Sequence, residues 1–166
     1  MTLVAAAGFY FFRYGIGRPV AATYALFATV ALGGLSRIPG TGRQRAAVVL
    51  RLVPVGWLLV IVGTCLSVRT WSAVLGMFAV GFALAFSAVS GPRQAGAAPG
   101  LQLLYILPSF PPYDPGSLDD RLLGTTTGMV LLAASEALVL PEPAPQPYRE
   151  RAAHAAMTAA HCATLL

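Results

Sequence analysis

Lysine is absent from the sequence, and charged residues of either sign are scarce. Only 10% of the 166 residues are charged, whereas an ordinary soluble domain carries about 25%. Hydrophobic residues make up 57% of the chain, and the mean hydropathy is +0.71. Because so few polar side chains cannot coat a water-soluble core, the composition excludes a conventional cytosolic domain. The 17 Gly and 13 Pro follow no period, which excludes collagen-like and disordered chains.

Catalytic and metal-binding signatures are missing as well. The sequence has no glycine-rich phosphate loop, no HExxH motif and no nucleophile-elbow serine. Two cysteines, Cys65 and Cys162, provide neither a disulfide framework nor a metal-ligand spacing. His154 and His161 are seven residues apart, but without further ligands we interpret them as a surface pair. We therefore expect no enzymatic activity, no bound metal or cofactor, and no ATP-driven transport by this chain alone.

Long apolar runs dominate what the sequence does contain. A membrane crossing takes about 20 residues, so the length permits five or six crossings. The runs cover residues 2–12, 20–36, 46–68, 71–90, 95–110 and 122–140. The first run is either a clipped helix or one that continues past Arg13, and Pro99 interrupts the fifth. The sequence predicts an all-α fold, a polytopic transmembrane helix bundle of about six hydrophobic segments.

A change in composition after Pro141 divides the chain. We predict a transmembrane helical domain over residues 1–141 and a cytoplasmic segment over residues 142–166. Four prolines between 141 and 147 predict an extended, polyproline-like linker. An alanine-rich helix is expected from Tyr148, and its apolar pattern runs to Leu166 without a C-cap signal. We therefore expect the chain to be truncated or to be one domain of a longer protein.

The arginines predict an orientation in the membrane. If the six segments alternate in direction, seven arginines share one side, and four share the other with Asp114, Asp119 and Asp120. The seven are Arg37, Arg43, Arg45, Arg51, Arg93, Arg149 and Arg151, and the four are Arg13, Arg18, Arg69 and Arg121. By the positive-inside rule the seven-arginine side is cytoplasmic, with both termini inside. The rule also explains the net charge of +5, so we expect no nucleic-acid partner.

Three stretches stand in an order typical of one membrane family. They are GRPVAATYALFATVAL (17–32) before a Gly/Arg-rich loop, GTCLS (63–67) leading into Trp71 and the run 76–86, and LYILPSFPPYDPGSLDDRLLG (104–124), which opens a span that closes at Pro141. In pattern and order, residues 15–150 resemble the fusaric acid resistance (FUSC) family. The resemblance implies a six-helix bundle in the bacterial inner membrane and membership of the aromatic acid exporter group.

The resemblance also sets the functional expectation. It implies efflux of aromatic or other organic acids; the alternative is a non-transporting membrane scaffold or accessory domain. Family members are usually larger, with a cytosolic portion and often a second membrane half, whereas this chain stops at Leu166 and has a short first segment. We therefore expect a homo-oligomer or a partner membrane subunit. Any driving force would come from an ion gradient or from that partner.

Two glycines predict a close helix contact in the last segment. Gly124 and Gly128 form a GxxxG motif, and small residues four apart let another helix approach closely. The alternative is that glycine is simply common in this chain.

Arg51 and Glu136 are the ionisable residues placed furthest inside the predicted spans. Each lies five residues, or about 7 Å, from the cytoplasmic end of its segment. Three interpretations remain open: an ion pair, a cavity-lining site that carries protons, and separate snorkelling of the two side chains to the interface.

A possible substrate path involves Gln102 and Tyr105 in the fifth segment. Tyr113, in the loop that follows, could stack on an aromatic substrate. The simpler interpretation is that all three are interfacial anchors or loop residues.

Overall fold

The computed structural model describes residues 2–110, 113–138 and 157, and every regular element in these residues is helical. The order is α1 (Thr2–Tyr10), η1 (Phe11–Ile16), α2 (Pro19–Val30), η2 (Ala31–Leu35), α3 (Gly42–Arg51), α4 (Val53–Leu66), α5 (Thr70–Ala88), α6 (Pro92–Ser109), η3 (Pro115–Ser117) and α7 (Leu118–Leu138). The predicted all-α fold is confirmed. The predicted linker and final helix of residues 142–166, with both histidines, fall outside the described residues apart from Met157.

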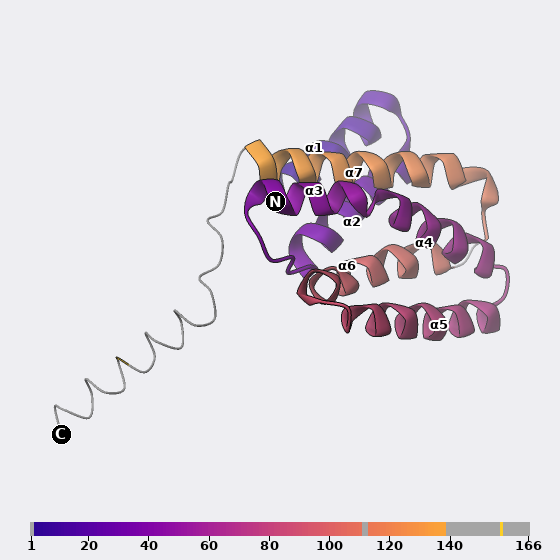
Figure 1. Ribbon diagram of the computed structural model, residues 1–166. Coiled ribbons are helices and arrows are strands. Elements are labelled where there is room, and N and C mark those ends of the chain that lie inside the picture. The colour runs from indigo at the N-terminus through magenta and orange to yellow at the C-terminus, as the bar shows by residue number, and fades with distance from the viewer. Residues whose placement is uncertain (1, 111–112, 139–156, 158–166) are drawn as a thin grey trace, which may run out of the picture.

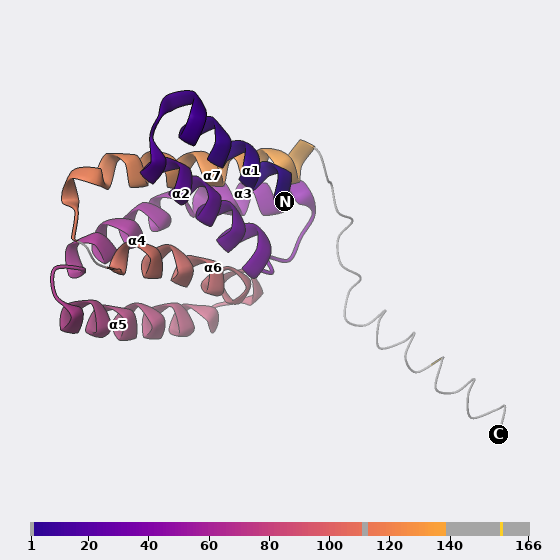
Figure 2. The same ribbon diagram turned by 180° about the vertical axis from the view of Figure 1, so that it is seen from behind.

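α3, α4, α5, α7 and most of α6 run along one common direction (Figure 1), and α1 and α2 cross it obliquely. α5 forms one edge of the bundle, α3 and α7 form the other, and α4 and α6 lie between them. α1 and α2 cover the far side, which Figure 2 brings to the front. The N-terminus, the start of α3, the α5–α6 turn and the end of α7 lie at one end of the bundle. The α4–α5 turn and the start of α7 lie at the opposite end.

The first segment continues past Arg13, so the helix is not clipped there. A π-helix, η1, extends α1 to Ile16, and the chain then turns at Gly17 with φ of 74°. This left-handed backbone conformation favours glycine. Pro19 begins α2, where its missing N–H costs nothing.

The third segment begins earlier than predicted and is broken. Thr41 and Gln44 form a capping box, which starts α3 at Gly42. Arg43 and Arg45 therefore lie on a helix, not in the basic loop that the sequence predicts. Because Pro54 offers no N–H and its ring crowds the preceding turn, α3 ends at Arg51 and α4 starts at Val53. The two helices meet at 43°.

The predicted interruption at Pro99 is wrong, because α6 runs unbroken from Pro92 to Ser109. Pro99 is exposed, and so is Ala95, whose carbonyl group loses its usual N–H partner. Both therefore lie on the outer side of the helix and leave the buried side undisturbed.

Only one described helix, α5, is by itself long and apolar enough to cross a membrane. The bent pair α3–α4 is also long and apolar enough if it is taken as one span. The helix over Pro19–Leu35 is apolar but shorter. α6 and α7 have 18 and 21 residues and are long enough to cross a membrane, but they are too polar on average. Within the described residues each of the six apolar runs is mostly helical, and one or two of the helices have the properties of an independent span.

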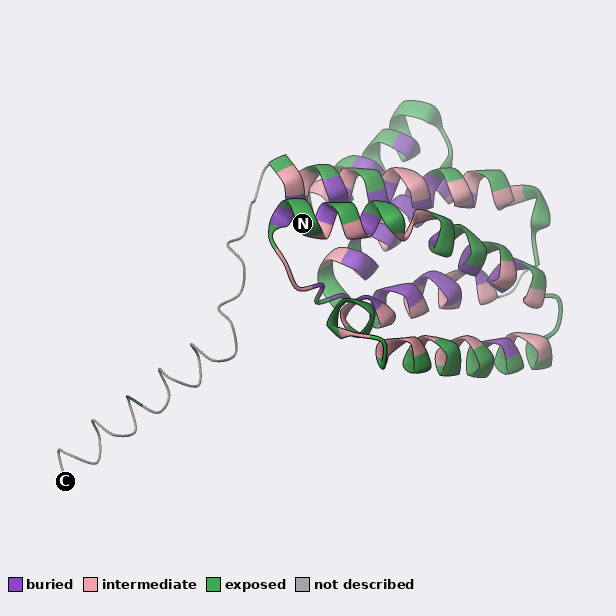
Figure 3. Ribbon diagram, viewed as in Figure 1, coloured by how far each residue is buried: buried purple, intermediate pink, exposed green. Residues whose placement is uncertain are grey.

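The main core lies between α2, α3, α4, α6 and α7, where buried positions face inward (Figure 3). Its largest fully buried side chains include Tyr105, Leu104, Met129 and Leu132. α5 contributes little to this core and is exposed over most of its surface.

Candidate functional site

The two glycines of the GxxxG motif lie at the contact between α2 and α7. A Cβ atom at Gly124 would collide with the carbonyl oxygen of Ala21, and one at Gly128 would collide with that of Ala25. Thr29 also donates a hydrogen bond across the contact to the Gly128 carbonyl oxygen, at 3.3 Å. The backbones of the two helices therefore touch directly, and this contact fixes how α7 is positioned.

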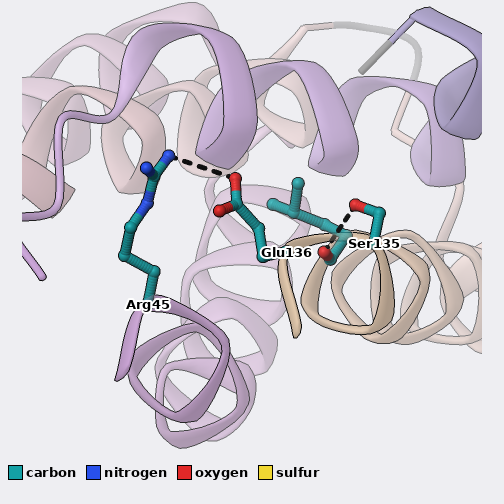
Figure 4. A network of polar contacts seen from close by, with 4 residues as sticks. Arg45, Ser135 and Glu136 are labelled. Carbon is teal, nitrogen blue, oxygen red and sulfur yellow. Dashed lines mark hydrogen bonds and ion pairs between the residues drawn. The ribbon is translucent and has the colours of Figure 1, made fainter. Parts of the chain in front are cut away.

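Further along α7, Glu136 forms an ion pair with a residue of α3. Its carboxylate oxygen Oε1 accepts a hydrogen bond from Nη2 of Arg45 at 3.1 Å (Figure 4). The Glu136 side chain is 9% exposed and the Arg45 side chain 20% exposed. Removing one partner of a buried ion pair costs about 3–5 kcal/mol, because the other charge is left uncompensated.

Arg51, the partner of Glu136 in the ion-pair interpretation, does not pair with it in the structure. Arg51 lies six residues after Arg45 on α3, which places it about 240° further around the helix. It is exposed and points away from α7, toward a groove between α3, α5 and α6. Arg45 is missed at the level of sequence because the third apolar run is expected to begin only at residue 46. The Thr41–Gln44 capping-box spacing is the signal that places Arg45 in the first turn of a helix.

A small cavity of about 10 Å³ lies beside the Arg45–Glu136 ion pair. Leu32, Ser36, Ile38, Val49 and Leu132 line it together with the pair. This volume matches about one water molecule. The cavity therefore has room for about one water molecule beside Glu136, and no room for an organic substrate.

A second polar cluster surrounds Arg121 at the opposite end of α7. Its guanidinium donates hydrogen bonds to Thr64 on α4 at 3.1 Å and to Ser117 at 2.8 Å. It also lies 5.7 Å from the centre of the Tyr24 ring on α2. The sequence predicts Arg121 at a polar end of the bundle, whereas the structure buries it between three helices.

A groove of about 460 Å³ lies between the α3–α4 bend, the last turns of α5 and the first turns of α6. Its polar lining consists of Arg51, Ser87, Arg93 and Gln94. Its apolar lining consists of Val48, Leu52, Val55, Ala83, Leu84, Ala97 and Leu101. The groove therefore combines two cationic side chains with an apolar wall.

Two further grooves are mainly apolar. One of about 260 Å³ lies between α5 and the end of α6, near Ser67, Thr70 and Ser109. The other, of about 370 Å³, lies between α1 and α2. Neither has a charged side chain among the described residues that line it.

The structure does not bring the three predicted path residues together. Tyr105 is completely buried, and its hydroxyl group donates to the Ala73 carbonyl oxygen at 3.2 Å, so it joins α6 to α5. Gln102 is half-buried near Gly81 of α5, and Tyr113 is exposed beyond the end of α6. None of the three lines the small cavity or the three grooves.

Aromatic side chains cover the outer surface of α5. Trp71, Phe78, Phe82 and Phe86 are each at least two-thirds exposed, and the last two rings stack. Leu75 and Val89 are exposed on the same surface. Exposed apolar patches of this extent are typical of contact with lipid or with another protein.

The part of the chain that the structure describes contains no group of three residues suited to hold a metal ion. Comparisons with protein-family models, with curated proteins and with solved structures gave no significant match.

Proposed function

We propose that this chain is a membrane-embedded transporter domain that exports aromatic or other organic acids across the bacterial inner membrane, as its resemblance to the FUSC family implies. The observation that supports the membrane setting of the proposal is the outer surface of α5, and the resemblance alone supplies the class of substrate. A helix of 19 residues that leaves Trp71, Phe78 and Phe86 uncovered is suited to lipid and poorly suited to water. The six helical segments are then the six crossings of the bundle.

The low hydropathy of α7 is compatible with a crossing, because its polar residues face inward. Arg121, Thr125 and Glu136 are buried, whereas Leu123 and Val130 are exposed. Polar groups inside membrane bundles face the interior or a cavity in this way. Lipid would therefore contact an apolar surface of α7, although the mean hydropathy of the helix is modest.

The charges at the two ends of the bundle support the proposed orientation. The start of α3, with Arg43 and Arg45, and the start of α6, with Arg93, lie at the same end. Asp119 and Asp120 lie at the start of α7, at the opposite end. The positive-inside rule makes the arginine-rich end cytoplasmic.

Glu136 is the candidate for coupling export to a proton gradient. It is a buried carboxylate in the bundle, it pairs with Arg45, and a water-sized cavity adjoins it. A proton on Glu136 would remove the negative charge from this pair and weaken the α3–α7 contact. Such intramembrane carboxylates form proton relays in pumps and transporters.

Everted membrane vesicles test the proposal. Vesicles containing the full chain receive labelled 1-naphthoate outside and are energised to make the lumen acidic. A weak acid distributes passively away from an acidic lumen, so uptake against that tendency reports transport in the export direction. We expect uptake that a proton ionophore abolishes and that Glu136→Gln abolishes without loss of folded protein. Uptake equal to that of vesicles lacking the chain would contradict the proposal.

One observation favours the alternative of a membrane scaffold. The grooves lie at the bundle surface, and the cavity beside Glu136 in the described residues holds only one water. A scaffold would need no path through the bundle, whereas a transporter would need a second conformation or a second subunit. Stable, folded protein that transports no acid but retains a partner subunit on purification would support the scaffold.

A further inference from the structure

The groove of about 460 Å³ contains two arginines that are not neutralised within the described part of the chain. Neither Arg51 nor Arg93 forms an ion pair among the residues that the structure describes, whereas Arg18 and Arg45 each pair with a carboxylate. No described acidic residue lines the groove. Its lining therefore carries two positive charges available to an anion.

Arg51 lies at an unusual depth for an exposed charge. It is the last of the ten residues of α3, so it is about 13 Å along the helix from Gly42 at the arginine-rich end. In the proposed membrane setting this depth is inside the hydrocarbon region. Ionisable groups placed there face a cavity and mark ligand pathways by default. The 43° bend between α3 and α4 positions Arg51 and Leu52 at this groove.

The rest of the groove is suited to an amphiphilic anion. Ser87 and Gln94 add neutral hydrogen-bonding groups beside the arginines, and Leu52, Leu84 and Leu101 provide an apolar wall. The volume falls within the range of about 300–1,000 Å³ typical of small-molecule sites. A guanidinium binds a carboxylate through two parallel hydrogen bonds, which makes arginine well suited to this anion.

We propose that the groove binds aromatic carboxylates, with the carboxylate at Arg51 and Arg93 and the ring against Leu52 and Leu84. The inference rests on the proposed function for the class of acid and names the site that captures it. The groove includes the last turns of α5 and the first turns of α6, which lie at the arginine-rich end, so it would load acid from the cytoplasm. Neither the GxxxG contact nor the Glu136 ion pair belongs to it.

Direct binding to the purified full chain in a non-ionic detergent tests the site. The probe is 1-naphthoate, and its neutral counterpart 1-naphthylmethanol is the matched control ligand. We expect naphthoate to bind and the alcohol to bind at least about tenfold more weakly, because a charge-assisted hydrogen bond is lost. Arg51→Gln and Arg93→Gln should each weaken naphthoate binding about tenfold. Arg43→Gln, an exposed residue of α3 outside the groove, should leave it unchanged.

Three results would overturn the inference. These are equal affinity for the acid and the alcohol, unchanged binding in the Arg51→Gln/Arg93→Gln double variant, and binding of phosphatidylglycerol with no binding of naphthoate. The last result would make the groove a site for anionic lipid. Vesicle uptake separates this inference from the proposed function. Binding without uptake would retain the site and reject transport, and uptake unchanged in the double variant would retain transport and reject the site.

Discussion

The ion pair between Arg45 and Glu136 permits a quantitative test of how α3 and α7 are held together. Nη2 of Arg45 lies 3.1 Å from Oε1 of Glu136, and the two side chains are 20% and 9% exposed, respectively. Breaking a buried pair by removing one partner costs about 3–5 kcal/mol. We expect the two single variants to differ, because the two side chains differ in their access to the surroundings.

Arg45→Gln should be the more damaging change, with a loss of about 3–5 kcal/mol in the free energy of unfolding, because it strands the short, nearly buried Glu136 side chain. Glu136→Gln should cost about 1–3 kcal/mol, since the longer and more exposed Arg45 side chain can turn outward. The double variant, Arg45→Gln/Glu136→Gln, buries no charge and should recover most of the loss, leaving it within about 1 kcal/mol of the unaltered protein.

The assay is denaturant unfolding of the purified protein in detergent, followed by tryptophan fluorescence. Arg43→Gln is the control, because Arg43 is an exposed residue on the same helix. A double variant as unstable as the sum of the two single variants would show that the two residues act independently. That result would refute the ion pair as the tie between α3 and α7.

Three further predictions concern packing, polar contacts and orientation. Gly128→Ala should lower the free energy of unfolding by about 2 kcal/mol or more, because the added Cβ collides with α2, whereas Gly34→Ala at an open position should cost less than about 0.5 kcal/mol. Equal melting temperatures in detergent would contradict this. Thr64→Val should lower the free energy of unfolding by about 1–3 kcal/mol, because the buried guanidinium of Arg121 loses a hydrogen-bond acceptor. An unchanged denaturant unfolding curve would mean that this hydrogen bond does not stabilise the fold. In a background without native cysteines, an impermeant maleimide should label Thr70→Cys in intact cells and Ser90→Cys only after lysis, and the reverse pattern would invert the proposed orientation.

Periodicity and composition predict the helical content well, because the described part of each apolar run is mostly helical. The boundaries depend on local chemistry that the runs do not reveal. The capping box at Thr41 and Gln44 starts α3 at Gly42, four residues before the apolar run begins. Pro54 divides the third run into two helices. Pro99 is expected to interrupt a helix, but its place on the outer side of α6 makes it harmless.

The candidate site is predictable in part. The depth of Glu136 in an apolar run identifies it as a candidate site residue. Depth alone does not show whether its partner is Arg45 or Arg51. That choice depends on the angular position of each arginine around α3, and hence on where α3 begins. The groove with Arg51 and Arg93 lies between the α3–α4 bend, α5 and α6. No residue spacing in the sequence predicts that these segments pack together. Tyr105 is expected on a polar path, whereas its ring is buried and its hydroxyl group is satisfied by the backbone of α5.

In the proposed function the outer surface of α5 faces lipid, and spin-label accessibility at Phe78 tests this contact. Phe78 is 78% exposed on this surface, and Ser90 is exposed in the α5–α6 turn. In a cysteine-free background, nitroxides are attached at Phe78→Cys and at Ser90→Cys, and the protein is reconstituted in bilayers. We expect the label at 78 to collide more with oxygen than with a water-soluble nickel complex, and the label at 90 to show the opposite preference. Greater collision with the nickel complex at 78 would mean that α5 faces water and would contradict the account.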